Sequence, residues 1–405
     1  MVNADRTTSK TLTSAGWFDI QINGLDGVDF NRAGVAPPEF EKAVRANWRA
    51  GVTRFLPTVI TGLEDHLIAC LRSIDEAVTA SELVSDAVPG IHLEGPFISP
   101  EDGARGAHPL KAVRPPDLAM FDRLQAAAGG RITLVTVAPE HPGSVEFIRE
   151  LTSRGIRIAL GHTLATTEQI SAAVDAGATL STHLGNGIPA SINRHHNQIW
   201  DQLADERLTA SAIFDGHHLP PNLMRVVHKV KGEGLLVLVS DAVSLAGMPP
   251  GRYTEHVGGA VELHPNGRLT QADSNYLAGS ASLLLAGVNT ALAVLDIEPY
   301  AVFELVTRAP ERAMGLEPRD DRLKLRLEVS EAQSPNPSSR HEPSTGVREE
   351  DPHPLNPSSR QTPSTGVREN TPETRRTNAY STRHLTIEEV WVKGALVHAN
   401  GEDLR

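Results

Sequence analysis

The stretch that most constrains the fold is residues 155–187, where two short apolar runs flank a segment of helical periodicity. The runs, 156–160 and 178–182, predict strands, and the segment between them predicts a helix. Strands that alternate with helices are typical of a parallel sheet. His162 follows the first strand and His183 ends the second. Both should therefore lie at the carboxyl edge of the sheet, where α/β folds place their chemistry.

The same alternation of strand and helix runs through most of the chain. Eight strands in order are what a closed (β/α)8 barrel needs, and this α/β barrel is the predicted fold class. Two amphipathic helices, 283–295 and 300–314, should cover its outside, and 257–269 predicts an inserted hairpin. The second strand is expected to end at Pro57. The eight strands are predicted at 17–23, 52–56, 90–93, 132–137, 156–160, 178–182, 208–214 and 235–239.

Changes in composition divide the chain. Residues 1–15 precede the barrel, which we assign to 16–327 together with its covering helices. Residues 328–384 contain an internal repeat rich in Pro, Ser and Arg, too poor in apolar residues to offset the entropy of ordering. We expect this segment to be disordered, either as an inert insertion or as a functional tether. An alternating pattern returns in 385–405 and predicts a hairpin.

Charge and cysteine content narrow the class of protein. The formal net charge of −12 argues against nucleic acid or an anionic membrane surface as a partner. The single cysteine, Cys70, excludes an internal disulfide framework and fits a reducing compartment. The polar start of the chain predicts no signal peptide, and no apolar run approaches the length of a membrane span. We therefore expect a soluble cytoplasmic protein.

Four polar residues follow predicted strands and should converge on one mouth of the barrel. They are Glu94 after the third strand, His162 and His183 after the fifth and sixth, and Asp241 after the eighth. One carboxylate and two imidazoles are the protein ligands of a catalytic zinc site. A second carboxylate can serve as general base. Each residue alone could be a helix cap or a hydrogen-bonded core residue, but four matched strand ends favour a single site.

Further polar residues around this mouth could bind a substrate. His108 lies in a Gly-rich loop after the third strand and could polarise a carbonyl group. Residues 186–187 could present side-chain and backbone donors. Arg194 could bind a phosphate or carboxylate through its guanidinium group, or simply be a solvated loop residue. One of the two histidines at 217–218 is expected to touch substrate.

A series of short motifs in a fixed order resembles the N-acetylglucosamine-6-phosphate deacetylases of the amidohydrolase superfamily. The resemblance runs from about residue 16 to 316 and covers most of the predicted barrel. The motifs are His-Leu-Glu-Gly-Pro-Phe at 92–97, Gly-Ala-His at 106–108, Val-Ala-Pro-Glu at 137–140, Gly-His-Thr at 161–163, Thr-His-Leu-Gly-Asn at 182–186, Asp-Gly-His-His at 215–218, Ser-Asp-Ala at 240–242 and Ala-Gly-Ser at 278–280.

The resemblance implies a role for each site residue. Gln21 and Asn23 stand where many amidohydrolases carry a His-x-His metal pair, which implies one tightly held divalent metal. Zinc is expected, with iron or manganese as alternatives. By the resemblance, the metal ligands are Glu94, His162 and His183, the base is Asp241, the carbonyl-polarising group is His108, and the substrate-binding residues are Asn186, Gly187, Arg194, His218, Gln21 and Asn23.

The implied reaction is removal of the acetyl group from N-acetylglucosamine 6-phosphate, giving glucosamine 6-phosphate and acetate, by a homodimer. In the family, a small β-domain precedes and follows the barrel, so residues 1–15 and 385–405 would form an incomplete version of it. Arg194-His195-His196-Asn197 replaces the usual Arg-Glu-Pro-Gly, and Asn186-Gly187 replaces Asn-Ala. A different N-acyl or cyclic amide substrate is therefore an alternative, as is a non-catalytic barrel that binds a ligand or partner.

Overall fold

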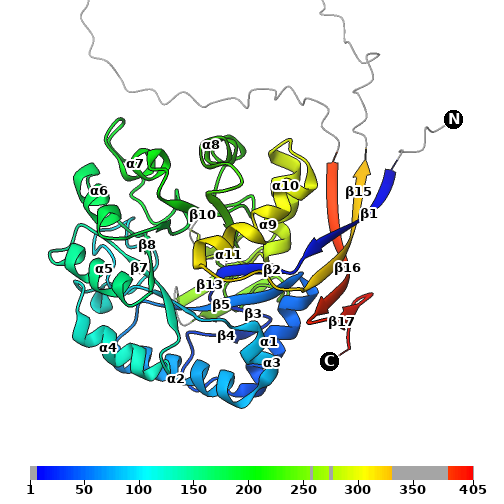
Figure 1. Ribbon diagram of the computed structural model, residues 1–405, viewed down its shortest axis with the longest axis horizontal. Coiled ribbons are helices and arrows are strands. Elements are labelled where there is room, and N and C mark those ends of the chain that lie inside the picture. Colours follow the sequence, from blue (N-terminus) through cyan, green and yellow to red (C-terminus); the bar gives the residue numbers. More distant parts are fainter. Residues whose placement is uncertain (1–6, 256–258, 273–276, 331–381, 405) are drawn as a thin grey trace, which may run out of the picture.

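A computed structural model of the chain describes residues 7–255, 259–272, 277–330 and 382–404 (Figure 1). A large barrel surrounded by helices lies beside a smaller antiparallel sheet built from the two ends of the chain. Within the described residues, no helix is both long and apolar enough to cross a membrane.

Eight parallel strands form the barrel, as predicted. Their order is β11-β10-β9-β8-β7-β6-β5-β2, and a parallel bridge between Ile22 and Ala242 closes the ring between its two end strands. The amide of Asn23 donates to the carbonyl of Ala242 across the same junction at 2.7 Å. The strands are β2 (Trp17–Ile22), β5 (Val52–Ile60), β6 (Ile91–Glu94), β7 (Ile132–Val137), β8 (Arg157–Leu160), β9 (Leu180–Ser181), β10 (Thr209–Ile213) and β11 (Leu236–Val239).

The predicted end of the second strand at Pro57 is wrong, because β5 continues to Ile60. Proline cannot donate to a sheet ladder and is normally confined to strand edges or bulges. Here the pairing of β5 with β2 is irregular between Asp19 and Ile22, and Pro57 pairs with Ile22 just past this irregularity. The strand therefore tolerates the missing donor and extends toward the mouth of the barrel.

Alternation along the strands produces two apolar cores. In β11, Val237 and Val239 belong to the cluster that fills the barrel, whereas Leu236 and Leu238 belong to the larger cluster between strands and helices. This follows from the period of two along a strand. Ala309 and Met314 of α11 (Arg308–Met314) join the inner cluster, so this helix closes the end of the barrel opposite the mouth.

Eleven α-helices occur among the described residues. The expected helix at 300–314 is broken into α10 and α11, because the carbonyls of Leu305 and Val306 accept hydrogen bonds from the amides of Leu238 and Phe18 on the barrel strands. The sequence patterns also missed α3, α5 and α7. The helices besides α11 are α1 (Pro37–Arg49), α2 (Glu64–Ala80), α3 (Glu82–Ala87), α4 (Leu118–Ala127), α5 (Ser144–Ser153), α6 (Thr167–Asp175), α7 (Gln198–Ala204), α8 (Pro221–Lys231), α9 (Leu284–Val294) and α10 (Pro299–Glu304).

The small sheet is antiparallel, with the order β1-β15-β16-β17-β18. Its strands are β1 (Thr7–Ala15), β15 (Arg322–Ser330), β16 (Thr382–Val392), β17 (Ala395–Ala399) and β18 (Glu402–Asp403). The predicted hairpin forms between β16 and β17. The side chain of Asn289 on α9 exchanges two hydrogen bonds with the backbone of Leu385, at 2.6 and 3.1 Å. The sheet is thereby fixed to the outside of the barrel.

The boundaries of the small sheet differ from the expected ones. Residues 322–327 were assigned to the barrel segment but lie in β15, which pairs along its length with β1 and β16. Leu323, Leu325 and Leu327 are its buried side chains, at the spacing of a half-buried strand. Residues 328–330 and 382–384, expected in the disordered repeat, are strand. The rest of that prediction, at 331–381, lies outside the described residues.

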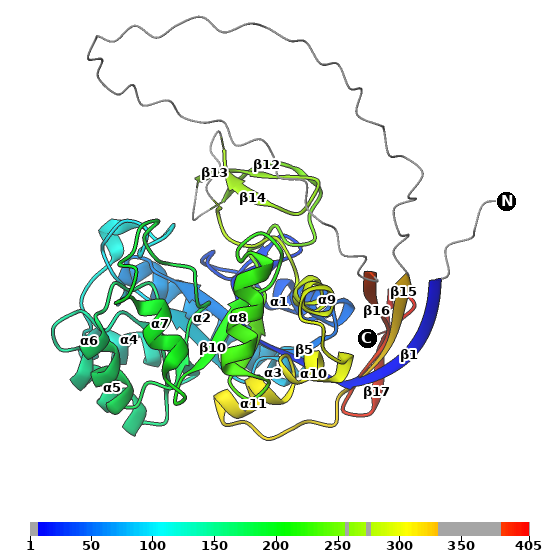
Figure 2. The same cartoon turned by 90° about the horizontal axis from the view of Figure 1, so that it is seen from above.

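A three-stranded sheet stands over the carboxyl end of the barrel, clearly separate from it in Figure 2. Its strands are β12 (Gly251–Glu255), β13 (Gly259–Leu263) and β14 (Leu269–Gln271). The predicted hairpin turn joins β13 to β14, but the third strand was not expected. Val261, Leu263 and Leu269 form a small apolar cluster with Leu245 and Ala278, separate from the two barrel cores.

Candidate metal centre and active site

The chain turns in the same unusual way after three barrel strands. His162, His183 and Asp241 each lie two residues beyond the end of β8, β9 and β11, and their φ angles are 50°, 28° and 47°. Side chains other than glycine rarely adopt this left-handed region, and such strain persists where the surrounding structure imposes it. The three turns place these side chains at the mouth of the barrel together with Glu94, the last residue of β6.

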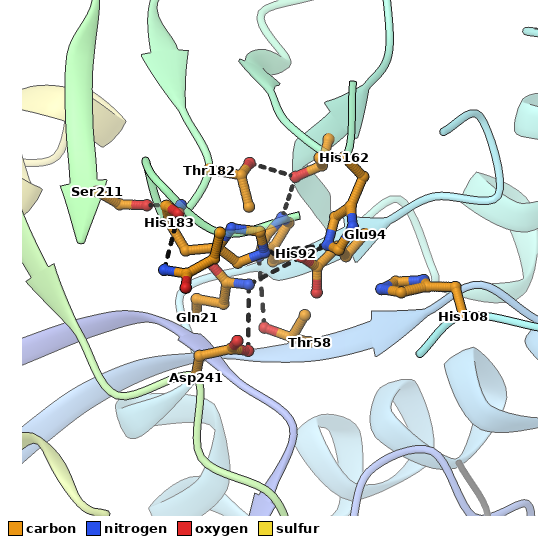
Figure 3. Close-up of polar contacts among 12 residues, drawn as sticks. Gln21, Thr58, His92, Glu94, His108, His162, Thr182, His183, Ser211 and Asp241 are labelled. Carbon is orange, nitrogen blue, oxygen red and sulfur yellow. Dashed lines mark hydrogen bonds and ion pairs between the residues drawn. The ribbon is translucent and has the colours of Figure 1, made fainter. Parts of the chain in front are cut away.

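Glu94, His162 and His183 meet at one point (Figure 3). Oε1 of Glu94 lies 3.1 Å from Nε2 of His162 and 2.9 Å from Nε2 of His183, and the two Nε2 atoms are 3.0 Å apart. All three residues are buried. Two imidazole nitrogens and a carboxylate oxygen therefore lie within about 3 Å of one another, close enough to bind the same ion. This donor set suits a divalent metal and leaves a coordination position open.

The surroundings of His162 fit the role of a ligand. Its Nδ1 donates to the carbonyl of Ala104 at 2.8 Å, which leaves the lone pair on Nε2. Gly187 packs against the same ring, where a Cβ would lie 2.8 Å from Nδ1. With a φ of +58° as well, position 187 requires glycine here.

Two carboxylates and two imidazoles are buried together at this site. Burial opposes ionisation of Glu94, but its contacts with the ring nitrogens of His162 and His183 outweigh burial and hold its pKa well below the usual range. Burial and the negative charge of Glu94 raise the pKa of Asp241 to about 6. A bound cation would offset this repulsion between two buried carboxylates.

Gln21 and Asn23 hold the carboxylate of Asp241 in place. Nε2 of Gln21 donates to Oε1 of Glu94 at 3.0 Å and to Oδ1 of Asp241 at 3.2 Å, while Nδ2 of Asn23 donates to the same Oδ1 at 2.7 Å. Asn23 lines the cavity described below, whereas Gln21 does not. Their contacts are thus with the carboxylates, although the sequence analysis grouped both with the substrate-binding residues.

His108 lies beside His162, with ring centroids 4.4 Å apart. Burial, together with the charge of His162, lowers the pKa of His108 to about 3, so its imidazole is neutral. Its Nδ1 lies 2.8 Å from Oγ1 of Thr61. When the Thr61 hydroxyl donates to Nδ1, Nε2 carries the hydrogen and can donate to a carbonyl oxygen. Thr61 was not among the predicted site residues, because the second strand was expected to end at Pro57 and β5 continues to Ile60. A polar residue directly after a strand was the available signal.

A row of buried polar side chains forms hydrogen bonds between strands inside the barrel. Nδ1 of His92 lies 3.4 Å from the hydroxyl of Thr58 (Figure 3). Its Nε2 lies 2.8 Å from the hydroxyl of Thr136, which also contacts the hydroxyl of Thr182 at 2.7 Å. Burial lowers the pKa of His92 to about 4, so it is neutral. The row carries hydrogen bonds between strands and adds no charge to the site.

A cavity of about 240 Å³ opens beside the metal residues. His218, from the turn after β10, reaches this cavity, but Arg194 is exposed and does not line it. Asp29 and Asn31 also line the cavity and were not expected there. Among the described residues, no arginine or lysine contributes to its wall. The predicted site residues that line it are Asn23, Glu94, His108, His162, His183, Asn186, Gly187, His218 and Asp241.

Comparison with known proteins gives consistent results. No family model matches the chain. It is 32% identical over 306 residues to an N-acetylgalactosamine-6-phosphate deacetylase of Escherichia coli O157:H7, covering 76% of this chain and 79% of the relative. It is 34% identical over 340 residues to the N-acetylglucosamine-6-phosphate deacetylase of Bos taurus, covering 80% and 79%.

Solved structures give the same result. The N-acetyl-D-glucosamine-6-phosphate deacetylase of Mycobacterium smegmatis superposes with a TM-score of 0.71 at 29% identity, over 78% of this chain and 83% of that one. The corresponding enzyme of Thermotoga maritima gives a TM-score of 0.68 at 26% identity, over 78% and 84%. The similarity therefore extends over most of both chains.

Proposed function

The chain belongs to the N-acetylglucosamine-6-phosphate deacetylase family of the amidohydrolase superfamily, and from this premise we propose how its residues carry out the reaction. The chain removes the acetyl group of N-acetylglucosamine 6-phosphate, releasing glucosamine 6-phosphate and acetate. The observation that supports this most strongly is the buried carboxylate and imidazole pair of Glu94, His162 and His183, with a second carboxylate, Asp241, beside it.

Glu94, His162 and His183 would hold one divalent metal, for which we expect zinc. When bound, the metal supplies Lewis acidity, which lowers the pKa of water and polarises an amide carbonyl. The hydrogen bond from His162 to Ala104 keeps the nitrogen that faces Glu94 free to coordinate.

Asp241 is the proposed base. Both of its side-chain contacts within the described residues fall on Oδ1, from Gln21 and Asn23, so Oδ2 is available to take a proton from the attacking water. The protonated carboxyl then returns that proton to the nitrogen of the leaving amine, and the C–N bond breaks. One carboxyl group therefore serves both as base and as acid.

His108 stabilises the developing negative charge on the acetyl oxygen. Its low pKa keeps the ring neutral, and with the Thr61 hydroxyl donating to Nδ1, Nε2–H is the proposed donor. A neutral donor beside the metal residues adds a hydrogen bond in the transition state without adding a like charge to the site.

The identity of the sugar is a second question, because the E. coli relative is named for N-acetylgalactosamine 6-phosphate. We test both sugars together by measuring acetate release from the two 6-phosphates and from their unphosphorylated forms, using zinc-loaded protein. We expect acetate to be released faster from N-acetylglucosamine 6-phosphate than from the other three sugars. Faster release from N-acetylgalactosamine 6-phosphate would make that sugar the substrate. No acetate release from any of the four sugars would contradict the proposal.

We also propose a homodimer and a cytoplasmic location. The exposed position of Arg194 supports the first, since a residue away from its own cavity is free to approach another subunit. Light scattering of the purified protein at micromolar concentration would give twice the mass of one chain. A monomer would contradict the dimer. The single buried cysteine, Cys70, is compatible with a reducing compartment.

A further inference from the structure

We propose that His217 is a positioning residue that anchors the three-stranded sheet over the mouth of the barrel and thereby holds one wall of the cavity in place. This inference rests on the proposed function, because the substrate concerned is the acetamido sugar. His218 lines the cavity, whereas His217 does not. Of the two histidines expected to touch substrate, His217 therefore acts from outside the cavity.

One wall of the cavity, residues 277–279, is connected to the three-stranded sheet by backbone hydrogen bonds. Thr270 of β14 forms an antiparallel bridge with Leu277, and the amide of Ala278 donates to the carbonyl of Leu269 at 3.2 Å. The sheet stands over the carboxyl end of the barrel (Figure 2). A displacement of β14 would therefore displace this wall.

Apolar packing couples the same parts of the chain. Ala278 and Val243 both line the cavity, and both pack in the apolar cluster of the three-stranded sheet, together with Leu245. The amide of Val243 also donates to the carbonyl of Ser280 at 2.8 Å. The wall is thus held between the sheet and the residues that follow β11, so its position depends on where the sheet lies.

His217 contacts the tip of the sheet, in the turn between β13 and β14. Its Nε2 lies 3.1 Å from the carbonyl oxygen of Asn266. A carbonyl oxygen only accepts, so the ring donates through Nε2–H in this hydrogen bond. The backbone of His217 is itself fixed, because its amide donates to Oδ1 of Asp215 at 2.8 Å. A Cβ at position 267 would lie 3.9 Å from Nε2 of His217, so the turn rests against the ring.

The hydrogen bond between His217 and Asn266 joins two parts of the mouth that both contribute to the cavity. The turn after β10 contributes His218, and the three-stranded sheet contributes residues 277–279 through β14. Without this contact, the apolar cluster would still hold the base of the sheet, but its tip would lose an anchor. The wall should then be less well positioned, while the metal residues stay in place.

The test compares His217→Ala with the unchanged chain, both loaded with zinc. Loss of one hydrogen bond should raise KM for N-acetylglucosamine 6-phosphate about 2- to 10-fold, because the substrate must bind against a less ordered wall. The value of kcat should not change, since the metal residues and the proposed base are untouched. Binding of glucosamine 6-phosphate, measured by calorimetry, should weaken by the same factor as KM rises.

A conservative variant and a control separate this contact from a general structural role. The side-chain amide of His217→Gln can donate to the same carbonyl, so this variant should keep the KM of the unchanged chain. His264→Ala is the matched control, because His264 contacts Oγ1 of Thr270 at 3.0 Å, within the sheet itself. Its KM should also equal that of the unchanged chain.

Hydrogen exchange followed by mass spectrometry gives a readout that does not need turnover. In His217→Ala, the amides of residues 259–271 should exchange faster, because the tip of the sheet opens more often. The amides of β6 and β8, which carry no part of the contact, should exchange as before. If the unchanged chain releases no acetate, the proposed function fails, and this exchange experiment alone decides whether His217 anchors the sheet.

Several results would overturn the inference. An unchanged KM and unchanged exchange in His217→Ala would do so, as would a lower kcat at an unchanged KM. Equal losses in His217→Gln or in His264→Ala would assign the effect to the general stability of the sheet. If His217→Ala does not fold, His217→Phe, which keeps a ring without a donor, should raise KM and speed exchange in the same way.

Discussion

The two ends of the barrel both bury charged side chains, but in opposite ways. At the closed end, Arg54 of β5 forms an ion pair with Glu311 of α11, and only 5% and 4% of their side chains are exposed. Arg308 contacts the second oxygen of Glu311 at 2.8 Å. At the mouth, Glu94 meets two histidines, and a second carboxylate, Asp241, lies nearby.

The difference distinguishes a charge cluster that stabilises the fold, at the closed end, from one that can bind a metal and substrate, at the mouth. At the closed end two arginines pair with one carboxylate, and breaking such a pair costs stability because it leaves an unpaired buried charge. The mouth buries two carboxylates together and brings two imidazole nitrogens and a carboxylate oxygen to one point, where a metal cation could bind. Three residues at the mouth also adopt positive φ angles.

The largest expected effect is at the mouth. Asp241→Asn should lower turnover about 10²- to 10⁴-fold, because the amide cannot take the proton from water. Metal content should remain that of the unchanged chain, because Asp241 is not one of the three proposed ligands. Acetate release and elemental analysis on the same sample test this. Near-normal turnover in the variant would remove Asp241 from the mechanism.

The next effect concerns the closed end. Glu311→Gln should lower the free energy of unfolding by about 3–5 kcal/mol, because Arg54 is left buried without a full counter-charge. Urea denaturation measures this. The folded fraction should keep its kcat and KM. Replacing both partners, as Arg54→Met with Glu311→Leu, should recover most of the lost stability, and a double variant as unstable as the single one would contradict this view of the pair.

A smaller effect is expected at Gly187. Gly187→Ala introduces a Cβ 2.8 Å from Nδ1 of His162 and places alanine at a positive φ. The ring should shift, and metal affinity should fall about 10-fold, as when a neighbour that orients a ligand is lost. Competition with a chelator measures the affinity. Gly216→Ala is a control, because its φ is also positive but no atom lies within 4 Å of its Cβ. Equal affinities in both variants would show that the contact with His162 is unimportant.

The smallest effect concerns Asp19, a buried carboxylate with no cation among its hydrogen-bond partners. Burial raises its pKa to about 7, from 3.8. The folded chain therefore favours the protonated form, so its stabilising contribution is complete below about pH 4 and is lost as the pH rises through about 7. Asp19→Asn should flatten this part of the stability profile, which denaturation at about pH 5 and about pH 8 would measure. An unchanged slope would assign the dependence to other groups.

The sequence predicted the barrel and the convergence of the metal residues because both depend on local periodicity. Strand ends are visible as apolar runs, and parallel strands necessarily bring Glu94, His162 and His183 to one edge. The conformation of a long loop is not determined by a periodic pattern of this kind. The exposed position of Arg194 therefore could not be predicted from the residues around it.

The errors arose where a tertiary contact outweighed a local signal. Pro57 reads as a strand end, but an irregular register lets β5 continue, and Thr61 was overlooked as a result. The break between α10 and α11 depends on hydrogen bonds to strands far away in the sequence. The membership of Leu323 in the small sheet likewise depends on pairing with both ends of the chain.

A metal titration tests the central claim most directly. Protein freed of metal by a chelator would be titrated with zinc while acetate release from N-acetylglucosamine 6-phosphate is followed. The donor set of Glu94, His162 and His183 predicts that activity rises linearly and stops at one equivalent per chain, and that His183→Asn loses both binding and activity. Full activity in the metal-free protein, or a plateau only at two equivalents, would contradict the single-metal site.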